Sequence, residues 1–242
     1  MVQENNYKIE NFDPEVLREY DIRGVVGENI NLNTAYTIGR TFGHTVKSKL
    51  TSHTIVTGYD GRLTSPSLHK ALCEGLKDSG VKVINIGMGP TPMTYFAHYH
   101  FEADAAVMLT GSHNPSEYNG FKMVFNKHSF FAEDIQSLQK LLDNNELELA
   151  NGQLIYKDIT KEYIERVLLN ISLNKKLKIA WDPGNGAMGK VTREISEKLI
   201  NSENFIINEE VDGNFPNHHP DPTVPKNMVQ LISAVKENDC DI

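Results

Sequence analysis

The sequence contains little cysteine and no long apolar run. Only two of its 242 residues are cysteines, Cys73 and Cys240, so a disulfide framework is excluded and a reducing compartment is favoured. No apolar stretch approaches the roughly 20 residues that a membrane-spanning helix needs. The N-terminus MVQENNYKIENFDP is polar and lacks the apolar segment of a secretion signal. We therefore expect a cytoplasmic protein with no membrane partner.

An excess of basic residues is also missing. The formal net charge is −8, which argues against nucleic acid as a partner and would repel an anionic ligand at long range. Any anion site must therefore gather its positive charge locally. The candidates for this charge are Arg23, Arg62, His113 and Lys122.

Apolar periodicity and turn residues predict strands that alternate with helices. Helices are expected at 33–49, 66–79, 133–143, 160–170, 187–200 and 225–237, with a short aromatic helix ending near residue 100. Strands are expected at 54–57, 81–86, 105–109, 121–125, 177–181 and 205–208, with 240–242 as the first residues of another. Gly39 and Gly43 would allow close packing of the first helix.

This alternation predicts an α/β protein with two consecutive α/β domains, whose mixed, mostly parallel sheets are covered by helices. The segment 144–158 is polar and contains Asn151-Gly152, so it is the expected boundary. The predicted domains are residues 12–150 and 157–242.

One strand leads into the most informative loop of the chain. The apolar run 105–109 stops at Thr110-Gly111-Ser112-His113-Asn114-Pro115, which places Ser112 at the edge of a sheet, where open α/β folds bind ligands. Asn119-Gly120 predicts a tight hairpin turn, after which 121–125 returns as a strand carrying Lys122. An isolated Ser-His pair of this kind is also typical of a simple turn.

The longer motif separates these alternatives. TGSHNPSEYNGFK, residues 110–122, resembles the active-site loop of the α-D-phosphohexomutases, the phosphoglucomutase and phosphomannomutase enzymes. Three further segments are similar to family motifs and occur in family order: REYDIRG at 18–24, GYDGR at 58–62 and VDGNFPNHHPDP at 211–222. The resemblance extends from about Phe12 to Ile242 and implies that Ser112 carries a phosphoryl group.

The resemblance also implies roles for neighbouring residues. Arg23 would bind phosphate oxygens and His113 would donate a hydrogen bond to them. The resemblance implies a role at Lys122, and from its chemistry we expect this amine to stabilise the charge on the transferring group or to exchange a proton with the hydroxyl. The implied catalytic residues are Ser112, Lys122, His113 and Arg23, and the implied substrate-binding residues are Tyr20, Arg62 and Asn114. For Tyr20 and Arg62 a purely structural role stays open.

In this family a loop Asp-Gly-Asp-Gly-Asp-Arg holds the Mg²⁺ that also contacts the serine phosphate. The present sequence has only two Asp-Gly pairs, Asp60-Gly61 and Asp212-Gly213, and no tandem repeat. The resemblance therefore implies Mg²⁺ in the complete enzyme, bound partly through the phosphate on Ser112, with weak or no binding by this chain.

We thus expect the N-terminal half of a mutase that interconverts hexose 1-phosphate and hexose 6-phosphate through a bisphosphorylated sugar, inactive alone. The expected substrate is a phosphosugar. The alternative is a non-catalytic fragment or subunit, which needs a separate C-terminal chain to supply the remaining domains.

A remote alternative is an NAD-binding oxidoreductase. Residues 184–189 satisfy G-x-G-x-x-G after a predicted strand, and Glu209 follows about twenty residues later. Against it, Asp182-Pro183 is unusual for that turn, and the mutase resemblance accounts for the same glycines.

Overall fold

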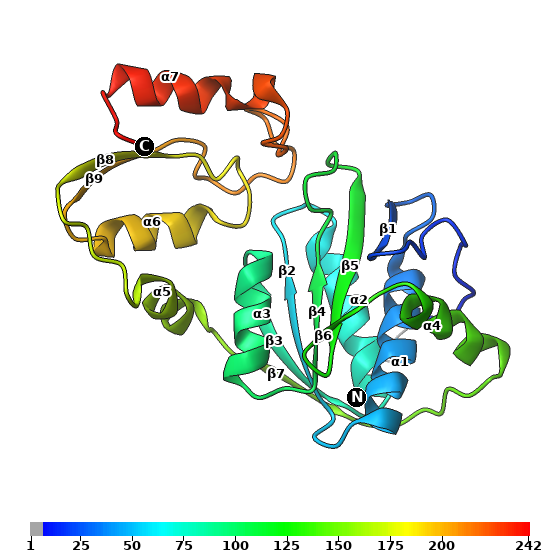
Figure 1. Cartoon of the computed structure of the whole chain (residues 1–242). Coiled ribbons are helices and arrows are strands. Elements are labelled where there is room, and N and C mark those ends of the chain that lie inside the picture. Colours follow the sequence, from blue (N-terminus) through cyan, green and yellow to red (C-terminus); the bar gives the residue numbers. More distant parts are fainter. Residues whose placement is uncertain (1–6) are drawn as a thin grey trace, which may run out of the picture. The chain divides into compact units, whose positions relative to one another are not determined.

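The computed structural model describes residues 7–242; the first six residues of the polar N-terminal segment lie outside the described residues. Within this range the chain forms two compact units. The first comprises residues 7–60, 64–112 and 117–158, and the second comprises 61–63, 113–116 and 159–242. Strands and helices alternate in both units, so the predicted α/β class is confirmed (Figure 1).

The first unit is built on a seven-stranded mixed sheet. Its strands are β1 (Ile22–Val25), β2 (Thr54–Tyr59), β3 (Lys82–Met88), β4 (Ala105–Leu109), β5 (Tyr118–Phe125), β6 (His128–Phe130) and β7 (Gln153–Tyr156). Their order is β1-β5-β4-β2-β3-β7, with β6 paired to β5. Strands β4, β2, β3 and β7 run parallel, whereas β5 is antiparallel to β4, β1 and β6.

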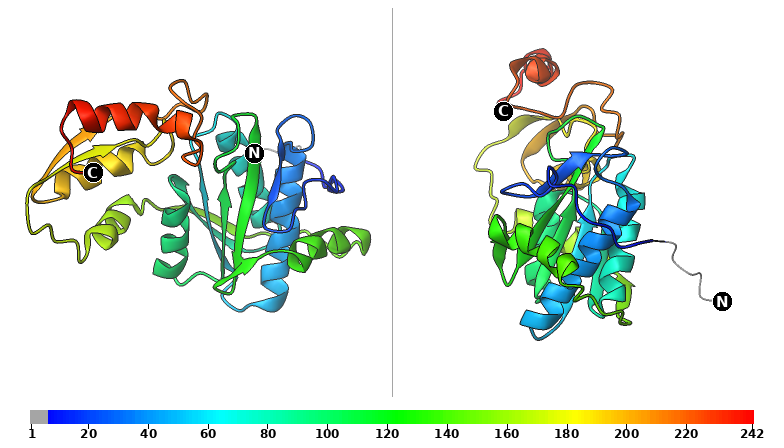
Figure 2. Two further views of the ribbon diagram at one scale, coloured as in Figure 1. Left: turned by 45° about the horizontal axis from the view of Figure 1, so that its top comes forward. Right: turned by 90° about the vertical axis from the view of Figure 1, so that its right-hand side faces the viewer.

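Four helices accompany this sheet: α1 (Leu32–Lys49), α2 (Ser65–Asp78), α3 (Thr91–His100) and α4 (Glu133–Asp143). Helices α1 and α2 lie side by side (Figures 1 and 2). Their backbones touch, because a Cβ added at Gly39 would lie 2.7 Å from Leu76 N, and one added at Gly75 would lie 3.1 Å from Arg40 N. The close packing predicted for the first helix is therefore confirmed at Gly39.

Strand β4 is buried on both faces, as its continuous apolar run predicts. Val107 and Leu109 belong to the core that the sheet forms with α1 and α2. Met108 points the other way, and its sulfur accepts a hydrogen bond from the Thr94 hydroxyl of α3 at 3.2 Å. Helices on both faces thus leave the strand ends as the accessible part of the sheet.

The second unit contains the parallel strand pair β8 (Leu177–Trp181) and β9 (Ser202–Ile206). Its helices are α5 (Thr160–Leu168), α6 (Gly189–Lys198) and α7 (Val229–Glu237), and a 3₁₀ turn (Pro225–Met228) precedes α7. Helices α6 and α7 lie on opposite sides of the strand pair (Figure 1). Over the described residues, no helix is both long and apolar enough to cross a membrane.

The predicted tight turn at Asn119-Gly120 is wrong. Both residues lie in β5, where Asn119 pairs with Gly24 and Gly120 with Arg23. The chain reverses earlier, in the loop 110–117, because pairing with β1 extends β5 toward its N-terminus.

Smaller differences occur in the second unit. Strand β9 begins at Ser202, three residues before the predicted start, and ends at Ile206. No strand is assigned to 240–242, although the Asp241 amide donates to Lys178 O at 2.8 Å and the Ala180 amide donates to Ile242 O at 2.9 Å. These residues therefore begin to pair with β8.

Candidate active site

Ser112 lies just beyond the carboxyl end of β4 and is exposed. Its φ of 55° is in the left-handed region, which costs a non-glycine residue on the order of 1–3 kcal/mol unless its surroundings hold it there. The Ser112 amide donates to the Thr110 hydroxyl at 2.9 Å. The loop thus leaves Ser112 exposed while its backbone amide is held by Thr110.

A carboxylate on the neighbouring strand end supports this loop. Asp60 follows β2, and its Oδ2 accepts hydrogen bonds from the Thr110 hydroxyl at 2.8 Å and the Gly111 amide at 3.1 Å. Its Oδ1 accepts from the Ser65 hydroxyl at 2.6 Å. Asp60 was not among the predicted site residues.

Two predicted cations meet at a second carboxylate. Asp21 Oδ2 lies 2.5 Å from Arg23 Nη2 and 2.8 Å from Lys122 Nζ. The side chain of Asp21 is only 7% exposed, whereas those of Arg23 and Lys122 are 18% and 28% exposed. Two cations around one buried anion leave the cluster with a net charge of +1, which suits an anionic ligand.

The backbone is tightly packed beside this cluster. Gly120 of β5 pairs with Arg23 of β1, and a Cβ at Gly120 would lie 3.3 Å from both Arg23 Cα and Thr110 O. The glycine therefore keeps β1, β5 and the start of the Ser112 loop in close contact. Lys122 lies two residues further along the same strand and pairs with Met108 of β4.

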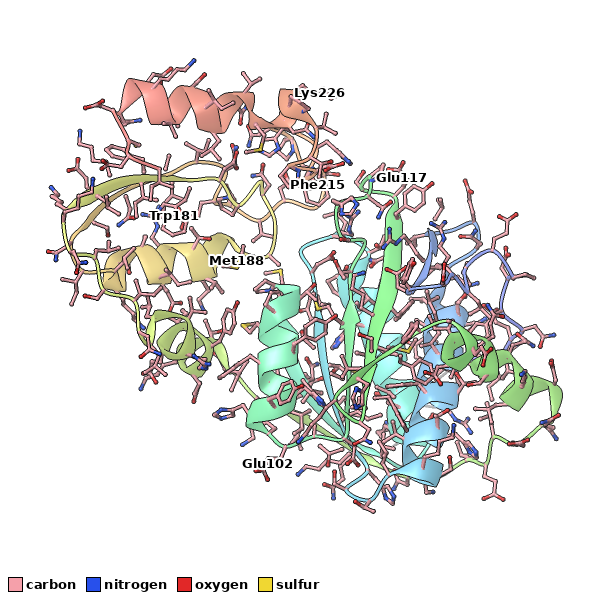
Figure 3. The ribbon with its side chains drawn as sticks, in the orientation of Figure 1. Glu102, Glu117, Trp181, Met188, Phe215 and Lys226 are labelled. Atoms are coloured by element: carbon pink, nitrogen blue, oxygen red, sulfur yellow. The ribbon has the colours of Figure 1, made fainter. Side chains whose placement is uncertain are left out.

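Arg62 lies differently from the other cations. It is 1% exposed, and its guanidinium donates to Asn114 O at 2.7 Å and to Pro115 O. The guanidinium also lies over the Phe215 ring, 5.2 Å from its centroid; Figure 3 labels Phe215. Arg62 thus holds the backbone of the segment that contains Asn114. All these residues belong to the second unit.

The remaining predicted residues are exposed. His113 follows Ser112 directly, and Tyr20 is 76% exposed just before the Asp21 cluster. The structure therefore brings together Arg23 with Lys122, and Arg62 with Asn114, whereas within residues 7–242 Tyr20 forms no hydrogen bond or ion pair with either group. Glu117, labelled in Figure 3, ends the loop before β5.

Sequence reasoning missed Asp21, Asp60 and Tyr95. Burial raises the pKa of Tyr95, and the nearby charge of Asp21 raises it further. The two aspartates lie inside the motifs YDIRG and GYDGR. Asp21 directly precedes β1, and Asp60 directly follows β2. A carboxylate at such an edge, beside predicted cations, is the signal that could have identified them.

The described residues offer no ready metal site. In residues 7–242, no three His, Cys, Asp or Glu side chains come together in a way that could hold a metal ion. Ser112 and the cations near it do not supply the oxygen ligands that Mg²⁺ prefers. The residues present therefore do not fit Mg²⁺ by themselves.

The glycine-rich turn 184–189 contains a buried asparagine that is hydrogen-bonded within the protein. Asn185 is 5% exposed, and its amide donates to Glu210 O at 2.8 Å and accepts from Asn217 at 2.9 Å. Glu209, the residue expected to bind a ribose in the NAD alternative, forms an ion pair with Arg193. Met188, labelled in Figure 3, directly precedes α6.

His218, in the predicted second-domain loop, pairs with Asp182. The imidazole Nε2 lies 2.9 Å from Asp182 Oδ2, and Nδ1 lies 3.0 Å from His219 O. Burial lowers the pKa of His218, but the His219 carbonyl and the Asp182 carboxylate outweigh it, so the pKa is raised from 6.5. The pair connects this loop to the end of β8.

Comparison with known proteins covers almost the whole chain. Residues 14–148 match the model of phosphoglucomutase/phosphomannomutase alpha/beta/alpha domain I, and residues 161–242 match domain II. The glycine-rich turn falls inside the domain II match, so the NAD alternative is set aside.

Individual relatives agree with this match. The chain is 44% identical to a phosphomannomutase/phosphoglucomutase of Pseudomonas putida over 94% of its own length and 49% of the relative's. It is 40% identical to a phosphoglucomutase of Neisseria meningitidis over 96% of the chain and 50% of the relative. A solved phosphoglucomutase/phosphomannomutase family protein of Burkholderia thailandensis superposes with a TM-score of 0.88 at 37% identity, covering 95% of this chain and 51% of that one.

The chain thus spans about half the length of the curated relatives it matches. The two matched segments together cover most of the chain, and the exposed Ser112 lies in the first of them. The chain belongs to the phosphoglucomutase/phosphomannomutase family, the α-D-phosphohexomutases.

Proposed function

We propose that this chain is the phosphoserine-bearing half of a mutase that interconverts hexose 1-phosphate and hexose 6-phosphate. The observation that carries the proposal is the exposed Ser112, held in a left-handed conformation at the end of β4, with Arg23 and Lys122 on neighbouring strands. Carboxyl ends of strands are where α/β folds bind ligands. Membership of the family supports the same assignment.

In the proposed reaction, phosphoserine 112 first donates its phosphoryl group to the free hydroxyl of a hexose phosphate. A P–O bond to the sugar forms as the bond to Ser112 Oγ breaks, which gives a bisphosphorylated sugar and a free serine. After the sugar turns over, the serine oxygen attacks the other phosphate and regains a phosphoryl group. In each step the attacking hydroxyl loses a proton and the leaving oxygen gains one, and Lys122 is our candidate for moving this proton between them.

The cation cluster would serve mainly to neutralise charge. Phosphoryl transfer requires positioning and stabilisation of the negative transferring oxygens. Arg23 can donate two parallel hydrogen bonds to phosphate, and Asp21 orients it together with Lys122. His113 would donate a further hydrogen bond from the loop itself.

Substrate contacts are assigned to Tyr20, Arg62 and Asn114. The exposure of Tyr20 supports a contact with a bound sugar phosphate. Because Arg62 already donates to Asn114 O and Pro115 O, we propose that it acts through the loop backbone rather than by a direct ionic contact.

Several parts of the complete enzyme would lie outside this chain. We propose that carboxylates from outside this chain would hold Mg²⁺ near the phosphate on Ser112. They would supply the oxygen ligands that the described residues lack. A separate C-terminal chain is one possible source. Of the expected domain limits, 12–150 and 157–242, we propose to extend the first through β7, because this strand pairs with β3 of the first sheet. We also propose a cytoplasmic location, which the two free cysteines Cys73 and Cys240 support.

The test is phosphorylation of Ser112. A protein extended to the length of its relatives, or this chain mixed with a separately produced C-terminal half, is treated with a hexose bisphosphate and analysed by intact mass and peptide mapping. We expect one phosphate on Ser112. Ser112→Ala should abolish it, and Ser116→Ala, in the same loop, should retain it. Phosphate found only at another serine would reject the assignment.

A further inference from the structure

Asp60 joins three separate segments of the first unit through its carboxylate. Oδ2 accepts hydrogen bonds from the Thr110 hydroxyl at 2.8 Å and the Gly111 amide at 3.1 Å, both at the start of the serine loop. Oδ1 accepts from Ser65, the first residue of α2, at 2.6 Å. The Asp60 amide also donates to Leu109 O at 3.0 Å, which fixes its backbone against the end of β4.

This arrangement controls the Ser112 backbone through Thr110. A threonine hydroxyl has a single proton, and an ionised carboxylate can only accept, so the Thr110 proton points to Asp60. The lone pairs of Thr110 Oγ1 are then left to accept the Ser112 amide, 2.9 Å away. The direction of one hydroxyl, set by Asp60, therefore stabilises the left-handed conformation of Ser112.

Asp60 also reaches the far end of the same loop. Ser65 donates to Asp60 and accepts a hydrogen bond from Asn119 Nδ2 at 2.9 Å. Asn119 is fully buried near the start of β5, where its Oδ1 accepts from the Gly120 amide at 3.0 Å. The loop 110–117 is thus connected to one carboxylate at both of its ends.

We propose that Asp60 is a positioning residue for Ser112. By holding the loop backbone in the left-handed conformation, which is unfavourable for serine, Asp60 sets the direction of the Ser112 hydroxyl. The assignment of Ser112 as the phosphoryl carrier rests on the proposed function. Asparagine cannot replace the carboxylate fully, because its NH₂ group would face either Thr110 and Gly111, which themselves donate, or Ser65, whose hydroxyl proton would then lose its acceptor.

The test uses the 242-residue chain and needs no turnover. Amide hydrogen exchange at Gly111 and Ser112, and the NMR HN–Hα coupling that reports φ of Ser112, are measured in Asp60→Asn, Thr110→Val and Thr110→Ser. We expect exchange at both amides to rise at least tenfold in Asp60→Asn, and at Ser112 in Thr110→Val, with an altered coupling. Thr110→Ser keeps the hydroxyl and should behave like the wild type.

The matched control is Asp182→Asn in the second unit. Asp182 also accepts three hydrogen bonds, from the backbone amide of Gly184, the side-chain amide of Asn208 and the imidazole of His218. Its substitution should nevertheless leave exchange at Gly111 and Ser112 unchanged. If Asp60→Asn fails to fold, the comparison of Thr110→Val with Thr110→Ser still tests the inference. Both of these variants keep the hydrogen bond between Asp60 and Ser65.

Unchanged exchange and coupling in the folded Asp60→Asn and Thr110→Val chains would overturn the inference, as would an equal rise in the control. If the loop responds as expected but Ser112 takes no phosphate in the extended protein, the proposed function fails and the positioning role of Asp60 stands.

Discussion

The shared carboxylate of Asp21 predicts that the two cations of the site are strongly coupled in their effect on stability. Removing either cation, as in Lys122→Met or Arg23→Met, leaves the buried Asp21 with one partner. Removing both leaves a carboxylate that is 7% exposed without either cation. The double variant should therefore be much less stable than the two single variants suggest.

The expected magnitudes follow from burial. A hydrogen bond to a charged group contributes about 1.5–3 kcal/mol, and the partial exposure of Lys122 and Arg23 places each single loss near the lower end, at about 1–1.5 kcal/mol. A buried charge left unpaired costs about 3–5 kcal/mol. We expect a coupling free energy of about 1–2 kcal/mol, within the usual range for contacting residues.

The assay must follow the first unit alone. The only tryptophan, Trp181, lies in β8 of the second unit, where Figure 3 labels it, so its fluorescence does not report on the cluster. Hydrogen exchange of β1 and β5 amides, measured where it reports opening free energy, gives the stability of the relevant strands. Lys77→Met, which removes an ion pair to Glu74 on α2 of the same unit, serves as the control and should change stability by less than about 1 kcal/mol. Additive effects of the two site substitutions would refute the reasoning.

In an extended, active protein, Lys122→Met should lower kcat by about a hundredfold or more, which corresponds to an activation free energy higher by on the order of 3 kcal/mol. Arg23→Ala should lower kcat/KM. Near-normal steady-state kinetics for both variants would contradict the proposed site. The isolated 242-residue chain should show negligible turnover with glucose 1-phosphate and mannose 1-phosphate and weak Mg²⁺ affinity by calorimetry, and robust turnover by this chain alone would contradict us. Because the pKa of His218 is raised in the folded protein, its pairing with Asp182 should stabilise the second unit fully at pH values below the unfolded pKa, near 6.5. This stabilisation should be lost as the pH rises through the higher folded pKa. Urea midpoints followed by Trp181 fluorescence should therefore fall over that range, and His218→Gln should flatten the change; an equal slope in both proteins would exclude His218 as its source.

The sequence alone predicted the elements whose signal is local. The apolar run 105–109 is flanked by loop residues and forms β4 as expected, since burial on both faces requires a continuous apolar strand. Helix α1 and its close packing at Gly39 followed from apolar spacing and the absence of a side chain. Ser112 was recognised because its loop motif is long, although its role remains a proposal.

The failures have a common physical cause, because they depend on partners far along the chain. Asn119-Gly120 has turn residues, yet pairing with Gly24 and Arg23 of β1 makes it part of a strand. Asp21 is separated from Lys122 by 101 residues, so no local pattern shows that they share a bond. Tertiary contacts of this kind override turn and strand propensities.

The backbone contact between α1 and α2 constrains how this protein can change. At Gly39 and Gly75 no layer of side chains separates the helices, so a substitution there cannot be relieved by choosing another rotamer. Even one added methyl group would have to move a whole helix, together with the core it covers. Neutral variation should therefore collect at outward positions such as Lys47 and Lys70, and the two glycines limit the routes by which the helix pair can evolve.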